Sequence, residues 1–153
     1  MDSLQTKNIQ LDMLMPLIRE TIAEGKSVRF SPRGISMLPM LRQGVDSVIL
    51  SAVPEKLHKF DLPLYQREDG KYVLHRIVKV EETYTCMGDN QFEAEPGLQH
   101  CQMIAMVTSF TRGDREIPVT ALSYRFYCRF WHYSRPVRHI LRRVKNKLRR
   151  MIR

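Results

Sequence analysis

The hydrophobic pattern of this 153-residue chain begins with a helical period. From Leu4 to Glu24, apolar residues recur at three- and four-residue spacing, which predicts an amphipathic helix. Its stripe consists of Leu11, Leu14, Met15, Ile18 and Ile22. Gly25 suits the C-terminal cap, and Pro16 indicates a kink or a start at that point. We expect this helix to pack on the domain, because its other face is mixed in charge rather than basic.

Between residues 27 and 119 the pattern is typical of short strands separated by turns. The strongest predicted strand alternates in polarity and includes His75, and its neighbour along the chain is expected to form a hairpin with it. Pro63 indicates an edge position or a distortion in its strand. The predicted strands are Ser27–Ser31, Gly44–Leu50, Lys59–Arg67, Tyr72–Val80, Thr83–Met87, Gln102–Phe110 and Glu116–Val119. The predicted fold is therefore mainly β, with an antiparallel, partly barrel-like core.

From Tyr124 onward, aromatic residues are interleaved with arginines, and a second helical stripe follows Pro136. This stripe consists of Val137, Ile140, Leu141, Val144, Leu148, Met151 and Ile152. Arginine and lysine fill the remaining positions, which predicts a basic amphipathic helix. The chain thus divides into an N-terminal helix (1–25), a β core (26–123) and an aromatic, basic C-terminal tail (124–153).

Charge is distributed as unevenly as hydrophobicity. The net charge is +9, but residues 125–153 hold eleven Lys and Arg and no Asp or Glu. The first 124 residues hold fourteen basic and sixteen acidic side chains. A basic segment indicates an anionic partner. An anionic membrane surface is favoured for the tail, and a solvated or partner-bound helix and nucleic acid are the alternatives. No helix-turn-helix pattern precedes the core, which disfavours a DNA-binding repressor.

The cysteines and the hydropathy of the chain suggest a cellular location. Cys86, Cys101 and Cys128 are odd in number and lack metal-ligand spacing, so we expect reduced thiols and predict no metal or cofactor. No apolar run approaches the ~18 residues of a membrane span. The first residues also lack the plan of a signal peptide. The predicted location is the cytoplasm, with the tail placing the protein peripherally on the inner membrane face.

A serine lies in an apolar setting at Gly34-Ile35-Ser36-Met37-Leu38-Pro39. A serine hydroxyl becomes a nucleophile only when a base takes its proton. Downstream groups occur in Leu74-His75-Arg76-Ile77-Val78 and Met87-Gly88-Asp89-Asn90. A histidine alone in a strand is more often structural than catalytic, and Gly-Asp-Asn is ordinary turn chemistry.

Together with Gly44-Val45-Asp46-Ser47-Val48, these blocks resemble the S24/S26 peptidase superfamily and occur in the family's order. That group holds the type I signal peptidases and the LexA-like self-cleaving repressors. The resemblance covers roughly Val28 to Val107 and implies an all-β catalytic core. A histidine stands where many members have a lysine, so the chain looks like the branch of signal peptidases found in the endoplasmic reticulum and in archaea.

The resemblance implies a serine endopeptidase that cleaves a protein or peptide substrate. Ser36 would attack the carbonyl carbon, His75 would act as general base, and Asp89 would orient the imidazole. The backbone N–H of Ser36 would hold the oxyanion. Gly34 stands where signal peptidases often carry a hydroxyl donor, and such a donor is worth ~10²–10³ in rate where it is used.

Other residues offer alternatives within the same scheme. Glu93 and Glu95 are available as the second acidic residue of the histidine branch. Lys71 and Lys79 are the alternative bases and rank below His75. Lys79 would lie ~13 Å along the strand from His75. The alternative function is a non-catalytic binding or regulatory module that acts through its basic tail on lipid, nucleic acid or a protein partner.

Overall fold

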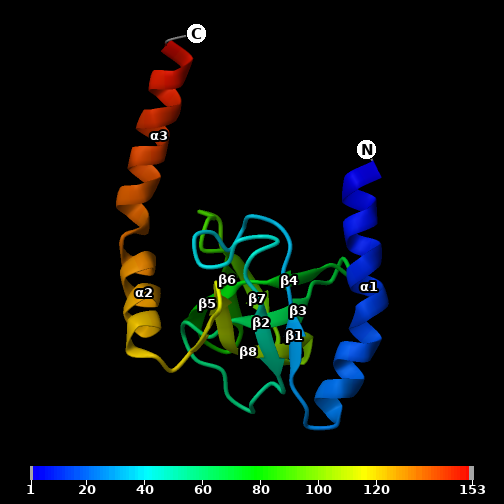
Figure 1. The fold of residues 1–153 in the computed structure, drawn as a ribbon. Helices are drawn as coiled ribbons and strands as arrows, with labels where there is room; N and C mark the ends of the chain where they lie inside the picture. Colours follow the sequence, from blue (N-terminus) through cyan, green and yellow to red (C-terminus); the bar gives the residue numbers. More distant parts are fainter. Residues whose placement is uncertain (1, 152–153) are drawn as a thin grey trace.

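The computed structural model describes the backbone of residues 2–151 and the side chains of residues 11–151. Two antiparallel sheets form the centre of the molecule, with helices on either side (Figure 1). Helix α1 (Asp2–Ala23) lies along one side, and α2 (Leu122–Tyr133) and α3 (Arg135–Met151) lie along the other. Both ends of the chain project toward the same end of the molecule.

The larger sheet has the strand order β1-β2-β8-β3-β4, with β9 paired to β8, and the smaller sheet has the order β5-β6-β7. The strands are β1 (Val28–Phe30), β2 (Val48–Ser51), β3 (Pro63–Gln66), β4 (Tyr72–Leu74), β5 (Arg76–Val80), β6 (Tyr84–Met87), β7 (Glu95–Leu98), β8 (Met103–Arg112) and β9 (Arg115–Pro118). A short 3₁₀ helix, His100–Gln102, precedes β8.

The predicted antiparallel core is confirmed, but the predicted fold class was too narrow. Over residues 2–151 the sheets do not close into a barrel, and the helices make the architecture mixed α/β rather than mainly β. Strand β7 was not predicted, because Pro96 and Gly97 lie within it and both residue types are depleted in strands.

His75 lies where the chain passes from one sheet to the other. Strand β4 pairs with β3, whereas β5 pairs with β6 in the second sheet. The prediction of one continuous strand over 72–80 was therefore wrong, although the hairpin with the next strand is confirmed. The alternation also fails, because residues 74–78 are all buried where the chain passes between the sheets. An enclosed crossover removes the exposed face that alternation requires.

Pro63 opens strand β3, which lies between β8 and β4. The edge position indicated by the sequence is therefore wrong. The alternative, a distortion, agrees with the register shift between Leu64 and Tyr65 against β8. A proline is tolerated at the first residue of a strand because its missing N–H interrupts the ladder least there.

Helix α1 packs on the larger sheet as predicted. Met15, Ile18 and Ile22 are buried in the main core. The helix continues through Pro16 rather than starting there. Gly25 follows it with φ of +75°, and its N–H donates to the carbonyl of Ile22, which confirms the predicted cap.

The C-terminal region forms two helices. Tyr124 and Cys128 of α2 are buried in the same core as α1, so α2 belongs to the folded body rather than to a detached tail. Among residues 2–151, no helix is both long and apolar enough to span a membrane. Ile152 of the predicted stripe lies outside the described residues.

Candidate active site

Ser36 lies in the connection between β1 and β2, in a turn whose backbone is held from two directions. The N–H of Gly34 donates to Gln43 Oε1 at 2.8 Å. On the other side, the N–H of Asn90 donates to the carbonyl of Ser36 at 2.8 Å, and Asn90 Nδ2 donates to the carbonyl of Ile35 at 3.1 Å. We call the segment 34–41 the serine turn.

Gly34 has φ of +96°, a left-handed conformation that strains residues with a side chain. A hydroxyl residue at this position would therefore require a different turn. Gly88 is needed for another reason: a Cβ there would lie 2.7 Å from the carbonyl oxygen of Ser36. The Gly88-Asp89-Asn90 block thus packs backbone to backbone against the serine turn and supports it.

Ser36 and His75 line one pocket of about 230 Å³. Arg67 and Gln91 also contribute to its wall. No hydrogen bond joins the Ser36 and His75 side chains in the described part of the chain. Such bonds are often long in enzymes without substrate and tighten when substrate binds, so the pocket is compatible with a nucleophile and its base.

The hydrogen bonds of His75 determine which of its ring nitrogens carries the proton. The Tyr65 hydroxyl lies 3.4 Å from His75 Nδ1 and donates its proton to Glu95 Oε2 at 2.8 Å. A phenol has one proton, so His75 Nδ1–H must be the donor to the Tyr65 oxygen. We infer that Nε2 carries the lone pair, which is the tautomer that a general base requires.

Glu95 terminates this chain of hydrogen bonds as an ionised carboxylate. Arg67 binds it with two hydrogen bonds of 2.7 Å. Burial opposes ionisation of Glu95, but the hydrogen bonds from Arg67 and Tyr65 outweigh it and lower its pKa. A series Arg67–Glu95–Tyr65–His75 therefore leads from the surface into the pocket.

The environment of His75 favours the neutral ring. Burial and the nearby Arg67 cation lower the pKa of His75 to about 4, and Glu95 and Asp89 oppose this shift only in part. His75 is therefore a proton acceptor across the neutral pH range. The negative charge of Glu95 favours the imidazolium that forms when the ring accepts a proton.

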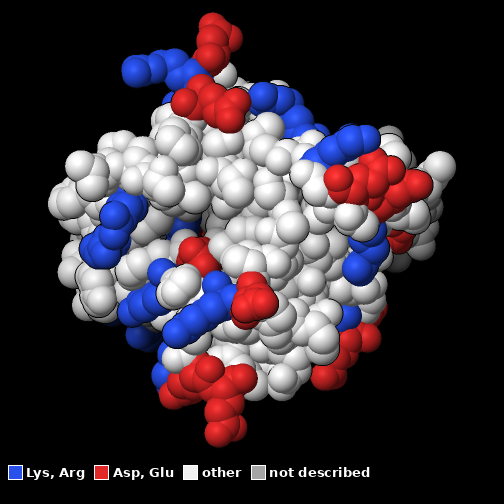
Figure 2. Space-filling model, turned by 90° about the horizontal axis from the view of Figure 1, so that it is seen from below, with Lys and Arg blue, Asp and Glu red and all other residues white. Residues whose placement is uncertain are grey.

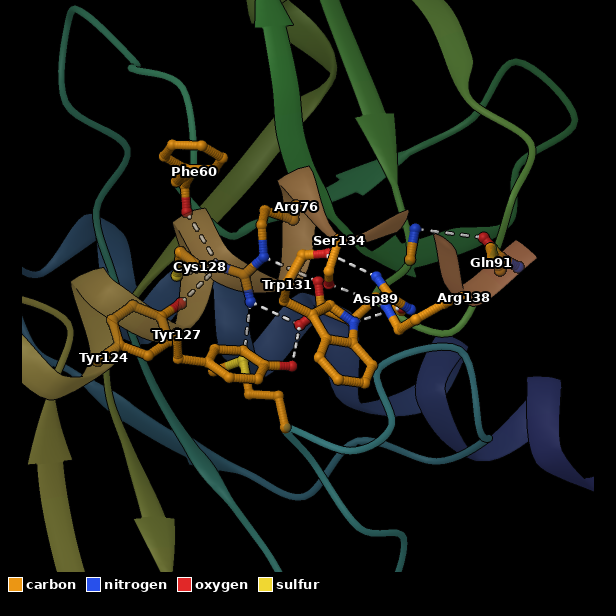
Figure 3. Close-up of polar contacts among 12 residues, drawn as sticks. Phe60, Arg76, Asp89, Gln91, Tyr124, Tyr127, Cys128, Trp131, Ser134 and Arg138 are labelled. Atoms are coloured by element: carbon orange, nitrogen blue, oxygen red, sulfur yellow. Dashed lines mark hydrogen bonds and ion pairs between the residues drawn. The ribbon is translucent and has the colours of Figure 1, made fainter. Parts of the chain in front are cut away.

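Asp89 is fully buried and its carboxylate is committed elsewhere. Arg76 binds it through Nε and Nη2, both at 2.8 Å, and Tyr127 donates a hydrogen bond of 2.9 Å (Figure 3). Trp131 donates to its backbone carbonyl at 2.7 Å. Within the described residues it makes no hydrogen bond to His75. The contacts therefore do not support the predicted orienting role of Asp89, because the guanidinium of Arg76, the residue after His75, binds the carboxylate in a bidentate pair.

The Arg76 guanidinium connects four parts of the molecule around this ion pair (Figure 3). Besides Asp89, it donates to the carbonyl of Phe60, the hydroxyl of Tyr124, Cys128 Sγ and Met40 Sδ, at 2.8 to 3.2 Å. Strand β5, which carries Arg76, is thereby joined to helix α2, the Phe60 segment between β2 and β3, the Asp89 loop and the serine turn at one buried cation.

The alternative residues named from the sequence lie outside the pocket shared by Ser36 and His75. Lys71 and Lys79 are exposed and pair with Asp69 and Glu81 at 3.0 and 2.8 Å. Glu93 is exposed, and of the two nearby acids only Glu95 connects to His75. Among the side chains of residues 11–151, no cluster of three His, Cys, Asp or Glu is arranged to hold a metal ion.

Sequence reasoning missed Tyr65 and Arg67, and treated Glu95 only as one of two alternatives. Tyr65 lies on β3 and Glu95 begins β7, in different sheets, so no local spacing relates them.

A search of protein-family models, of curated proteins and of solved structures found nothing that matches this chain.

Proposed function

We propose that this protein is a serine endopeptidase of the signal-peptidase-like type. Ser36 is the nucleophile and His75 the general base. The observation that carries the proposal is the shared pocket of Ser36 and His75, with Tyr65 favouring the His75 tautomer in which Nε2 carries the lone pair. The loop that contains Asp89 supports the serine turn, and Glu95 takes the place of the acid that would orient the His75 ring.

The proposed reaction follows from these positions. His75 Nε2 accepts the Ser36 proton while Ser36 Oγ bonds to the peptide carbonyl carbon. The imidazolium then returns the proton to the leaving amine as the peptide C–N bond breaks. His75 then accepts a proton from water as the water oxygen bonds to the acyl carbon, and passes the proton to Ser36 Oγ as the acyl–serine bond breaks. The Ser36 N–H makes no hydrogen bond among the described residues and is available to hold the oxyanion.

The test of the nucleophile is covalent labelling by a fluorophosphonate probe, located by mass spectrometry of the digested protein. We expect the label on Ser36 and none in Ser36→Ala. The matched control is Ser31→Ala, an exposed serine in the same connection, which should label as the wild type does. Cleavage of a peptide library should be lost in the same variant that loses the label.

An unlabelled wild-type protein would refute the peptidase proposal, and equal labelling of Ser36→Ala would refute Ser36 as the nucleophile. Unlabelled protein would favour the non-catalytic module of the same fold. Labelling that persists at another serine would make that serine the nucleophile and would leave the proposed class of function unchanged.

Tyr65 and Glu95 are proposed as positioning residues for His75. We expect Tyr65→Phe to lower the acylation rate by roughly tenfold, because the tautomer with Nε2 free is no longer favoured. In Glu95→Gln the carboxylate that raises the His75 pKa is lost, so the acidic limb of the pH–rate profile should move to lower pH. The measurement is the rate of probe labelling as a function of pH.

The control for these variants is Tyr84→Phe, which removes a hydroxyl bonded to the exposed His100. It should leave both the rate and the pH profile unchanged. A purely structural role for Tyr65 and Glu95 would lower the folded fraction without displacing the acidic limb, and that result would contradict the assignment.

A further inference from the structure

Helices α2 and α3 form a nearly continuous rod along one side of the molecule (Figure 1). Only Ser134 separates them, and it keeps a right-handed helical conformation. Its N–H donates to the carbonyl of Phe130 at 2.9 Å, and its carbonyl accepts from the N–H of Arg138 at 3.1 Å. These are the i→i−4 bonds of an α-helix, so the angular positions of side chains continue in phase from α2 into α3.

The rod carries one apolar stripe on its outer side. On α2 the stripe consists of Leu122, Phe126, Phe130 and Tyr133, which are 58–80% exposed. On α3 it consists of Val137, Ile140, Leu141, Val144, Leu148 and Met151, which are 50–73% exposed. At 3.6 residues per turn all of these positions fall within a sector of roughly 100°. We call this set the outer stripe.

The body of the protein contacts the opposite side of the rod. Tyr127 and Trp131 of α2 bind Asp89, and His139 of α3 stacks on Phe92 with ring centroids 4.7 Å apart. Arg138 lies over Trp131 at 3.7 Å from the ring centroid. The outer stripe therefore faces away from the body, and its members are at least half exposed, although the Lys59 ammonium lies 5.3 Å from the ring centroid of Tyr133.

The charge of the rod identifies the chemistry of what covers the stripe. The sequence from Leu122 to Arg153 contains no Asp or Glu, and the last acidic residue before it is Glu116. On the face seen from below, by contrast, Lys and Arg lie beside Asp and Glu, and wide uncharged areas separate these groups (Figure 2). Unbalanced positive charge beside an apolar stripe fits an anionic lipid surface, which offers headgroup charge and acyl chains together.

Two other occupants fit less well. A second copy of the chain would bring two uniformly basic helices together without any acidic side chain to pair them, and like charges at such flanks repel. Nucleic acid would be bound by the basic groups and would leave the apolar stripe in water.

We propose that the outer stripe docks this protein on the surface of a bilayer that contains anionic lipid. The rod lies in the interfacial plane with its stripe in the acyl boundary and its basic side chains at the headgroups. Because Tyr127 and Trp131 fasten α2 to the Asp89 loop, and this loop supports the serine turn, docking holds the Ser36 pocket at a fixed place beside the membrane. The docking itself requires no chemistry at Ser36.

The experiment is vesicle co-sedimentation of the full chain as Ser36→Ala, so that failure of the peptidase proposal leaves the result unaffected. Vesicles of phosphatidylcholine are compared with vesicles of phosphatidylcholine and phosphatidylglycerol. We expect at least about tenfold tighter binding to the anionic vesicles, weakened by added salt.

The matched variants are Leu141→Ser and Leu17→Ser, which remove leucines of 62% and 59% exposure from opposite sides of the body. We expect Leu141→Ser to weaken vesicle binding by about tenfold and Leu17→Ser to leave it unchanged. Circular dichroism should show both variants as folded as the parent.

Each other outcome overturns the proposal. Equal binding to neutral and anionic vesicles removes the role of charge. Equal loss in both variants removes the role of the outer stripe. A dimer in sedimentation equilibrium that Leu141→Ser dissociates, with vesicle binding unchanged, makes a second copy the occupant.

Discussion

Replacement of His75 by alanine is expected to slow acylation of Ser36 by about 10²–10⁴-fold, the contribution typical of a positioned general base. The physical reason is that the Ser36 hydroxyl then has no acceptor for its proton in the pocket. Because His75 is 4% exposed and its removal leaves a cavity, His75→Gln serves as a second variant that fills more of the space. Both are measured by probe labelling per folded molecule.

The pH dependence of the wild type follows from the same residue. Burial and Arg67 lower the pKa of His75 to about 4. The base acts only when deprotonated, so labelling should rise with pH up to about 4 and stay level through neutral pH. An ordinary exposed histidine would instead place this limb near pH 6.5. The acidic limb should disappear in His75→Ala.

The control is His58→Ala, because His58 is an exposed histidine outside the pocket. It should keep both the rate and the acidic limb of the wild type. Wild-type labelling of His75→Ala would refute the assignment of the base. An acidic limb near pH 6.5 in the wild type would show that His75 is not held in the buried environment described above.

Replacement of Asp89 by asparagine is expected to lower the free energy of unfolding by about 3–5 kcal/mol. The change leaves the Arg76 cation buried without its counter-charge, and both side chains are almost fully buried in the wild type. The measurement is urea denaturation, in which the midpoint should fall while the slope m stays constant.

An exposed ion pair provides the matched control. Glu81→Gln removes the partner of Lys79 in a pair whose side chains are each 62% exposed. Its effect should stay within about 0.5 kcal/mol. The double change Arg76→Met with Asp89→Leu should recover much of the loss, because no buried charge then remains.

The outcome for Asp89→Asn also separates two roles for this residue. If the variant keeps its stability but loses acylation rate per folded molecule, Asp89 orients His75 as predicted from the sequence. If stability falls and the rate per folded molecule is retained, the residue supports the serine turn through Arg76.

Much of the fold could be predicted from local patterns. The period of Met15, Ile18 and Ile22 predicted α1 and the face that it buries, because a helix repeats every 3.6 residues. The β5–β6 hairpin was predicted from two strand-like patterns that follow each other closely along the chain. The crossover at His75 was not, because a run that is buried on both sides carries no alternation to mark the point where a strand changes sheets.

The candidate site could be predicted only in part. The sequence directed attention to Ser36 and His75, and the structure places both in one pocket. The identity of the acid could not be read in the same way. Asp89 and Glu95 both follow His75 within about one hairpin and one loop, and the chain spacing is compatible with either.

The sequence by itself determined the periods of the elements, the segregation of positive charge into the last thirty residues and the stripe of α3, because these depend on neighbours along the chain. The tertiary structure decided which carboxylate connects to His75 by hydrogen bonds and which one pairs with Arg76. A hydrogen bond forms only when two groups come within about 3 Å, and residues from separate sheets reach that distance through packing rather than spacing. Thus Glu95 connects to His75 through Tyr65, while Asp89 is held by the guanidinium of Arg76.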